Sequence, residues 1–155
     1  MSIKKVGLLV LIAVVFGAGF LSIIVAKKNK LRPPAPAPVL QPFVGKFDIH
    51  AVDDLWAGGL RIVLCGAEFS KPQEMRAMMT AAARRDFQGL DVTCKPVGSG
   101  TPCDGNVAAR FRGAFVVQCF TSDGADLAER LVSKGILCGL PAQAGPTYKP
   151  CSPSS

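Results

Sequence analysis

Six cysteines are the residues of this chain whose type and number could do the most chemistry. None of them belongs to a Cys-x-x-Cys pair, and they stand at Cys65, Cys94, Cys103, Cys119, Cys138 and Cys151. Zinc sites are usually built on such close pairs, so a structural zinc is disfavoured. Disulfide staples for a small domain are the favoured interpretation, with a reactive thiol as the weaker one. Fifteen pairings are open. Among them, Cys94 could bridge to Cys103 across the loop that they flank, and Cys138 to Cys151 across the C-terminal tail.

Three other side chains could contribute to a site, but each has a simpler interpretation. His50 is the only histidine and has no matching nucleophile and acid around it in the sequence, so a surface position is favoured over a catalytic triad. Trp56 and Phe69 could stack on bases or sugars. Packing on the hydrophobic core is the favoured role for both.

The net charge of +7 suggests nucleic-acid binding only until its distribution is considered. Six of the 18 basic residues precede residue 46, whereas all 11 acidic residues follow it. The remaining domain carries 12 basic and 11 acidic residues, a net charge of +1. A polyanion-binding protein usually gathers basic residues on one surface. We therefore expect nucleic-acid binding to be weak or absent.

The uncharged apolar segment 6–26 is long enough to cross a membrane. As a helix it would extend about 31 Å, the thickness of the hydrocarbon core of a bilayer. A cleavable signal peptide is the alternative, with Gly17-Ala18-Gly19 at the cleavage site. The lysines and arginines that follow the segment favour a cytoplasmic location for the rest of the chain. The six cysteines favour an oxidising compartment, and we give them more weight, so we expect the domain to be exported. We therefore predict a single-pass protein of the inner (cytoplasmic) membrane, in contact with the lipid bilayer through residues 6–26 and with its soluble domain in the periplasm.

The rest of the chain divides by composition. A proline-rich run favours an extended, semi-rigid spacer. The predicted parts are a short basic N-terminus (1–5), the transmembrane anchor or uncleaved signal (6–26), a basic flank and proline-rich stalk (27–43), a folded domain (44–141) and an irregular tail (142–155).

Hydrophobic periodicity predicts the elements of the folded domain. Alternation predicts a strand over 47–52, a Gly-Gly turn leads into an apolar strand over 60–65, and further strands are expected at 90–95 and 114–120. Helices are expected from about residue 72 to 85 and over 125–134. In the first helix we expect a buried stripe made of Met75, Met78, Met79 and Ala82. With the strand that must precede the Gly-Gly hairpin turn, the order is three strands, helix, two strands and helix. It indicates an α+β fold with enough strands to close a small barrel.

Several segments together resemble a known family. They are Leu64-Cys65-Gly66-Ala67-Glu68, Val92-Thr93-Cys94-Lys95-Pro96-Val97-Gly98, Gly100-Thr101-Pro102-Cys103-Asp104-Gly105, Val116-Val117-Gln118-Cys119-Phe120 and Asp126-Leu127-Ala128-Glu129-Arg130-Leu131-Val132. The chain resembles, over residues 47–141, the exported thermonuclease-like proteins of rhizobial-type bacteria, which are relatives of staphylococcal nuclease. The resemblance implies a five-stranded OB-fold β-barrel with two or three packed helices. It also puts Cys65 and Cys119 on neighbouring strands, where they could pair.

The chemistry that the resemblance implies is calcium-dependent phosphodiester hydrolysis, and its site is degenerate in this chain. Asp53 and Glu68 stand at positions of calcium ligands. The two phosphate-binding arginines are replaced by Val63 and Ala114, and Lys71 replaces the catalytic glutamate. One donor to the transition state is typically worth about 10²–10³ in rate, and a general base about 10²–10⁴. Loss of all three groups should leave almost no hydrolysis.

Relocated residues could rescue the chemistry. Arg61 lies two residues before Val63 and Arg112 two before Ala114, so each shares a strand face with the position of the missing arginine. Glu74 is a candidate substitute for the lost glutamate. We therefore expect a catalytically inactive binding or scaffolding domain without a cofactor, whose partner is an envelope protein or polysaccharide machinery. An active nuclease that uses calcium is the alternative.

Overall fold

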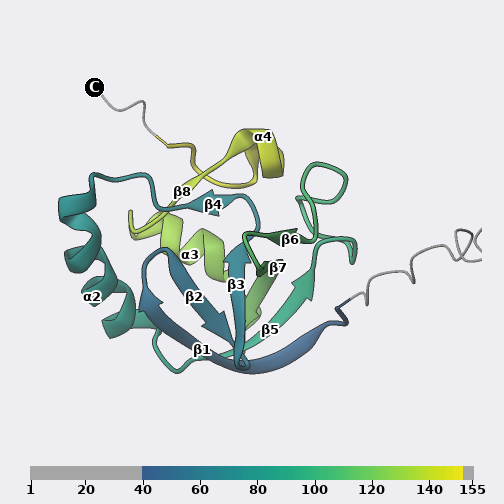
Figure 1. The fold of residues 1–155 in the computed structure, drawn as a ribbon, viewed down its shortest axis with the longest axis horizontal. Coiled ribbons are helices and arrows are strands. Elements are labelled where there is room, and N and C mark those ends of the chain that lie inside the picture. Colours follow the sequence, from purple (N-terminus) through teal and green to yellow (C-terminus); the bar gives the residue numbers. More distant parts are fainter. Residues whose placement is uncertain (1–39, 152–155) are drawn as a thin grey trace, which may run out of the picture. The chain divides into compact units, whose positions relative to one another are not determined.

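Five strands close into a β-barrel with helices packed around it, in the computed structural model of this chain (Figure 1). The strands are β1 (Phe43–Ala51), β2 (Asp54–Ala57), β3 (Leu60–Leu64), β5 (Asp91–Pro96) and β7 (Ala114–Thr121). Around the barrel the order is β1-β2-β3-β7-β5 and back to β1, with a parallel contact between β3 and β7 and antiparallel contacts elsewhere. The predicted α+β class and five-stranded barrel are confirmed, and the strand order is consistent with an OB-fold.

The structure describes residues 40–151. The predicted anchor 6–26, most of the predicted stalk 27–43 and the last four residues lie outside this range. Within it, none of the helices combines the length and the apolar character that a membrane crossing requires.

Two sequence signals account for the strands. Buried and exposed residues alternate strictly along β5, as expected when one face of a strand packs on the core. Gly58 and Gly59 connect β2 to β3 with φ angles of 57° and 77°, the left-handed conformation that two-residue hairpin turns require. Gly45 of β1 passes so close that an added Cβ would lie 2.3 Å from the Cα of Gly58.

Helix α2 (Arg76–Phe87), preceded by a 3-10 turn η1 (Gln73–Met75), buries a face that only partly matches the one predicted. Its buried residues are Thr80, Ala83 and Phe87. Met79 and Ala82 of the predicted stripe are half-buried and pack against the core, whereas Met78 is 56% exposed and Met75 is half-buried outside the core cluster, so the predicted stripe is only partly correct. Apolar spacing alone could not choose the face, because the orientation of α2 is fixed by polar contacts with β1.

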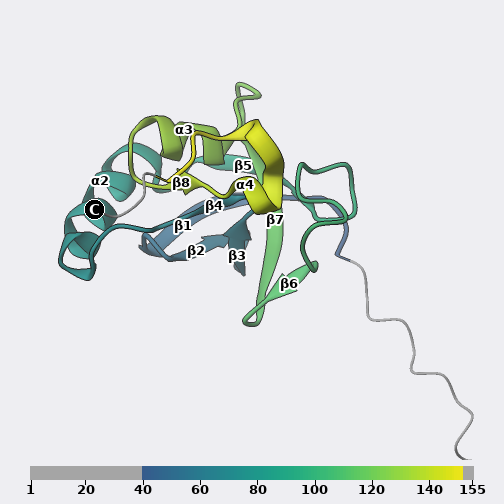
Figure 2. The same ribbon diagram turned by 90° about the horizontal axis from the view of Figure 1, so that it is seen from above.

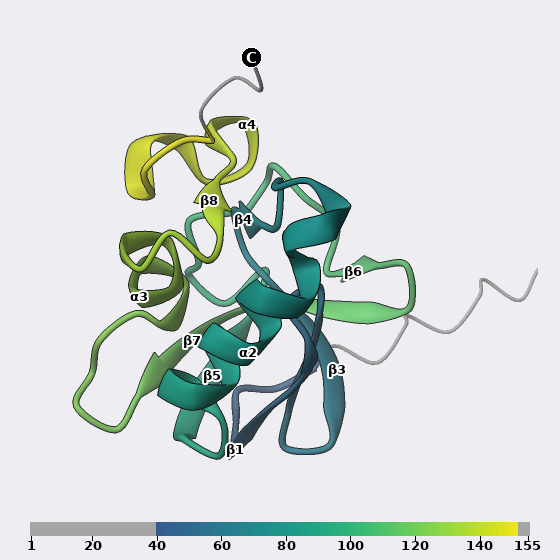
Figure 3. The same cartoon turned by 90° about the vertical axis from the view of Figure 1, so that its left-hand side faces the viewer.

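Helix α2 packs against the barrel (Figure 3), and its contacts with β1 lie beyond residue 46, where the pairing of β1 with β5 ends. The Thr80 hydroxyl accepts a hydrogen bond from the backbone N–H of Val52 at 3.0 Å. The Gln88 side chain accepts one from the N–H of Ile49 at 2.8 Å. Arg84 donates to the carbonyl oxygens of Ile49 and His50, both at 2.7 Å. Side chains of α2 and of its C-cap thus satisfy backbone groups that would otherwise lack a strand partner.

The C-terminal part of the domain begins with helix α3 (Leu127–Ser133). Asp126 caps its start by accepting hydrogen bonds from the N–H groups of Ala128 and Glu129. Gly135 follows its end with φ 69°. The remaining short elements are β4 (Ala67–Glu68), β6 (Arg110–Phe111), β8 (Cys138–Gly139), α4 (Pro141–Ala144) and a 3-10 turn η2 (Gly145–Thr147).

The segment predicted as an irregular tail is part of the fold up to residue 151. Ala144 and Tyr148 are each only 4% exposed, and the hydroxyl of Tyr148 donates to Asp126 at 2.9 Å. A Cβ on Gly66 would lie 2.2 Å from that of Ala144, so the tail sits directly on the β3–β4 connection. Burial of the Tyr148 hydroxyl beside Asp126 raises its pKa well above its usual range.

Three disulfides staple the domain, and only one of the three suggested pairings is correct. Cys138 pairs with Cys151 as suggested. The other two bonds are Cys65–Cys103 and Cys94–Cys119, in place of Cys94–Cys103 and Cys65–Cys119. Strands β3 and β7 are indeed neighbours, but Cys119 lies directly opposite Cys94 in the β5–β7 ladder, with their Cα atoms 4.0 Å apart. Cys65 follows the end of β3 and reaches instead the loop that carries Cys103.

Candidate functional site

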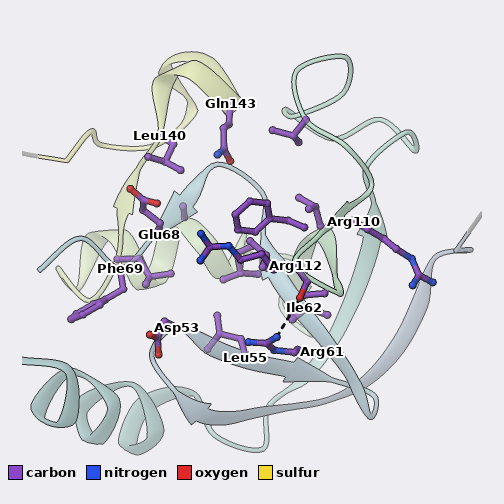
Figure 4. Close-up of a pocket in the computed structure, with 18 of the residues that line it drawn as sticks. Asp53, Leu55, Arg61, Ile62, Glu68, Phe69, Arg110, Arg112, Leu140 and Gln143 are labelled. Atoms are coloured by element: carbon purple, nitrogen blue, oxygen red, sulfur yellow. Dashed lines mark hydrogen bonds between the residues drawn. The ribbon is translucent and has the colours of Figure 1, made fainter. Parts of the chain in front are cut away.

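A cleft of about 550 Å³ opens on the face of the barrel formed by β2 and β3, beside the β5–β7 connection (Figure 4). Its floor is apolar and consists of buried side chains of the barrel and of the segment after α3. These include Leu55, Ile62, Leu64, Val116 and Leu137. Half-buried Val63, Phe69 and Leu140 line its sides. Pockets of this size and apolar character hold small organic ligands in many proteins.

The cleft brings together six of the eight residues singled out in the sequence. It is lined by Asp53, Arg61, Val63, Glu68, Arg112 and Ala114. Lys71 precedes η1 and Glu74 belongs to it, and neither residue lines the cleft. Glu74 is therefore not placed to replace the missing general base from within the cleft. Val63 on β3 and Ala114 on β7 present apolar side chains where the resemblance implies arginines.

Asp53, in the turn between β1 and β2, is held by an arginine that the sequence did not single out. Arg76, the first residue of α2, donates to its Oδ1 from Nη2 at 2.6 Å and from Nε at 2.8 Å. The hydrogen bond from Arg76 lowers the pKa of Asp53 below its usual value. The two residues are far apart in sequence, and no local spacing signal connects them.

A calcium ion does not fit this donor set. Calcium takes six to eight oxygen ligands, usually including several carboxylates. In this cleft Asp53 is neutralised by Arg76, which leaves Glu68 as the only other carboxylate. Within residues 40–151 there is no cluster of three or more His, Cys, Asp and Glu side chains that could hold a metal ion.

Arg61 is also committed to a neighbour. Its Nε donates to Oδ1 of Asp54 at 2.8 Å, and its Nη1 donates to the carbonyl oxygen of Arg112 at 3.5 Å. Asp54 also accepts from Nε1 of Trp56 at 3.3 Å and lies 3.7 Å from Nδ1 of His50. The His50 and Trp56 rings pack with centroids 5.2 Å apart. The cluster is an outer-surface network, so neither His50 nor Trp56 lines the cleft.

The β6–β7 hairpin contributes cleft residues that sequence reasoning missed. It projects from the barrel (Figure 2), and its residues Arg110, Phe111 and Arg112 line the cleft. Arg110 packs its guanidinium 4.1 Å from the ring centre of Phe115 and points away from the cleft (Figure 4). Phe111 is 54% exposed. An aromatic residue between two arginines was a usable signal, since this combination is common at binding surfaces.

Arg112 occupies the turn of this hairpin in an unusual backbone conformation. Its φ is 48° and that of Gly113 is 82°, so both residues are left-handed, as a two-residue turn requires. Among residues 40–151, Arg112 is the only residue other than glycine with positive φ. Asn, Asp or Gly is normally preferred at such a position because a longer side chain is strained there. The guanidinium of Arg112 lies over the ring of Phe111 at 5.1 Å and is directed into the cleft (Figure 4).

Three charged groups that line the cleft, Glu68, Arg110 and Arg112, have no opposite charge among residues 40–151, and of these Arg110 points away from the cleft (Figure 4). Among residues 40–151, neither Glu68 nor Arg112 forms an ion pair, whereas Asp53 and Arg61 do. The cleft therefore offers one free carboxylate, one free guanidinium that faces into it, and an apolar floor.

Comparisons of this chain with protein-family models, with curated proteins and with solved structures found no match. The resemblance to thermonuclease-like proteins stays a prediction from the sequence segments that carry it.

Proposed function

We propose that this chain is a non-catalytic binding domain with an OB-fold of the thermonuclease-like type, held at the periplasmic face of the inner membrane by its N-terminal segment. The observation that carries the proposal is the ion pair between Asp53 and Arg76. A carboxylate needed for calcium is instead neutralised by an arginine at 2.6 Å. The groups that thermonuclease-like hydrolysis requires would then be missing both at the calcium site and at the phosphate-binding positions.

The location of the cleft supports a binding role. OB-folds take their ligands on the face of strands 2 and 3 and on the loops between strands 1 and 2 and strands 4 and 5. Here Asp53 lies in the first of these loops, and Arg110, Phe111 and Arg112 lie in the second, since β5 and β7 are the fourth and fifth barrel strands. The occupant of the cleft would belong to an envelope protein or to polysaccharide machinery.

The disulfides support the export part of the proposal. Three bonds use all six cysteines, and bonds of this kind persist in oxidising compartments. Measurement of the mass of the mature protein in membrane fractions tests the anchor. Retention of residues 6–26 is expected, and a soluble product that lacks them contradicts it.

A nuclease assay tests the absence of catalysis. The full chain, purified in mild detergent, is incubated with single-stranded DNA and RNA, once with calcium and once with a chelator. We expect no cleavage above background in either condition. Calcium-dependent cleavage that is lost in Arg61→Ala or Arg112→Ala, and kept in Arg85→Ala on the exposed side of α2, would overturn the proposal.

An active calcium-dependent nuclease is the second candidate, favoured by one observation. Arg61 and Arg112 line the same cleft as Asp53 and Glu68, so the relocated arginines and the carboxylates are at least brought together. Against it, Arg61 is paired with Asp54 and Glu74 lies outside the cleft. The Arg76→Ala variant discriminates further. If the nuclease is only masked, release of Asp53 should produce calcium-dependent cleavage.

A further inference from the structure

We infer that the cleft binds a zwitterion, a ligand that carries both an ammonium and a carboxylate group on an apolar body. This inference rests on the proposed function, because it assumes that the cleft holds a ligand. Its basis is the pair of opposite charges that the cleft leaves free, namely Glu68 and Arg112.

Arg112 is built to present its guanidinium to an anion. Its left-handed backbone is a conformation that costs an ordinary residue about 1–2 kcal/mol relative to the right-handed form. Strain of this kind tends to persist where the side chain has a task. The side chain stacks on Phe111 and turns into the cleft (Figure 4), which leaves its donor edge free for a bidentate contact with a carboxylate.

The backbone at Glu68 is also held in place. It lies on β4, opposite Cys138 of β8, and Cys138 is fixed by its disulfide to Cys151. An ionised carboxylate can only accept hydrogen bonds, so an ammonium group is its natural partner. Arg112 directs its guanidinium toward the side of the cleft where Glu68 lies (Figure 4), yet the two do not form an ion pair.

Of the other charged groups that line the cleft, two are in ion pairs and one is directed away from it. Asp53 is bound by Arg76, Arg61 is bound by Asp54, and Arg110 points away over Phe115. A purely anionic ligand would meet the repulsion of Glu68, and a purely cationic one that of Arg112. Both side chains are exposed, so water solvates them in the free protein. A ligand with both charges would pair with both groups, and the apolar floor of the cleft suits a hydrocarbon side chain.

Two sources could supply this chemistry, a free apolar amino acid or a short peptide with free ends. The test measures binding to the full chain in mild detergent by calorimetry. The probes are phenylalanine, the tripeptide Ala-Leu-Ala, its N-acetylated form and its C-terminal amide. We expect at least one of the two zwitterions to bind. If the peptide is the ligand, each blocked form should bind about tenfold more weakly, because each block removes one charge-assisted hydrogen bond. Binding of phenylalanine alone assigns the amino acid.

Charge-removing variants assign the two ends. Arg112→Gln should weaken binding of the free peptide and abolish the difference between the free and the amidated peptide. Glu68→Gln should weaken binding of the free peptide and abolish the difference between the free and the acetylated peptide. Arg112→Gln keeps the strained turn occupied by a long side chain, so it tests charge rather than folding, and thermal melts verify both variants. Arg85→Gln and Glu74→Gln, which lie outside the cleft, are the matched controls.

Three results would overturn the inference. The first is that neither zwitterion binds at millimolar concentration. The second is that blocked and free peptides bind equally, which indicates an apolar groove only. The third is that succinate binds more tightly than either zwitterion and that Glu68→Gln strengthens succinate binding, which indicates an anion site. Each of these leaves the proposed function intact, because that function is tested separately, by the nuclease assay and by the mass of the mature protein.

Discussion

Arg112 is the residue at which local stability and the proposed function conflict. Relief of its left-handed strain, about 1–2 kcal/mol, exceeds the roughly 0.5 kcal/mol of an exposed cation–π contact with Phe111. We therefore predict that Arg112→Asn raises the free energy of unfolding by about 0.5–1 kcal/mol, since asparagine tolerates this conformation. Chemical denaturation measures it. Arg112→Lys, which keeps strain and charge, should show no gain, and a less stable Arg112→Asn variant would show that the arginine stabilises the hairpin.

Asp104 should make the β5–β7 loop sensitive to acid. Its carboxylate accepts hydrogen bonds from the Thr101 hydroxyl at 2.6 Å and from the N–H groups of Gly98 and Gly100 at 2.7 and 2.8 Å. These bonds, that of Thr101 first, lower the pKa of Asp104 to about 2. Because the folded pKa is depressed, the stabilisation is complete above the unfolded value near pH 4 and is lost as pH falls toward 2.

Thermal melts of Asp104→Asn between pH 7 and pH 2 test this. The variant should melt below the parent at pH 7, and the difference should shrink between about pH 4 and 2. Asp91→Asn, which removes an exposed carboxylate with a single lysine partner, controls for lost surface charge. A difference in melting temperature that is the same at every pH would contradict the assignment.

At the scale of residues, the sequence predicted which positions meet in the cleft better than what they do there. Asp53 and Glu68 were singled out by the resemblance, and Arg61 and Arg112 by lying two residues before the replaced arginines; all four line the cleft. The partner of Asp53 could not be predicted. Arg76 comes from a helix whose orientation depends on tertiary contacts, and no periodicity encodes those.

Among the elements, helix α2 makes its most buried polar contact with the end of β1 through one hydroxyl. Thr80 is 8% exposed, accepts from the N–H of Val52 and donates to the carbonyl oxygen of Arg76. Thr80→Val leaves the buried N–H of Val52 without a partner, which should lower the free energy of unfolding by about 1–3 kcal/mol. Chemical denaturation checks this, with Thr80→Ser as the control because serine keeps the hydroxyl. A Thr80→Val variant as stable as the parent chain would contradict this role of the hydroxyl.

The strands were predictable and the face of α2 was not, for the same physical reason. A strand that borders a core must alternate, so its pattern reports its burial directly, as in β5 and β1. In α2 the methionines and alanines are spread around the helix, and Met78 ends up exposed. The face is selected by Thr80 and Arg84, polar residues that a hydrophobic pattern ignores.

For the molecule as a whole, the C-terminal segment is a structural part of the domain. Ending the chain after Leu140 removes buried Ala144 and Tyr148 and leaves Cys138 without its partner. We predict a loss of more than about 3 kcal/mol, since the disulfide alone is typically worth about that amount for a loop of this length. Urea unfolding of the full chain in mild detergent measures it. A chain that ends at Cys151 retains every described contact and is the control; equal stability of the two truncations would contradict the prediction.

This part of the fold was hidden from sequence reasoning because Pro, Gly and Ser dominate its composition. Such composition is typical of irregular backbone, and the backbone is indeed mostly short turns. Its burial comes from a few residues, Tyr148 above all, that fill space beside Gly66 and Asp126. The pairing of the cysteines was hidden for a related reason, since it follows the register of the strands rather than their proximity in sequence.

The parallel contact between β3 and β7 also determines the order in which the chain can be assembled. It pairs Ile62 with Phe115, so the barrel closes only after the whole segment between β3 and β7 has been ordered. Closing such a non-local pairing is slow in proteins. Cys94–Cys119 and Cys138–Cys151 span 25 and 13 residues and need no closed barrel, whereas Cys65–Cys103 spans 38 and joins the end of β3 to the β5–β7 loop. During oxidative refolding, thiol trapping followed by mass mapping should therefore find the Cys65–Cys103 bond last. A chain that carries this bond is one whose barrel has already closed.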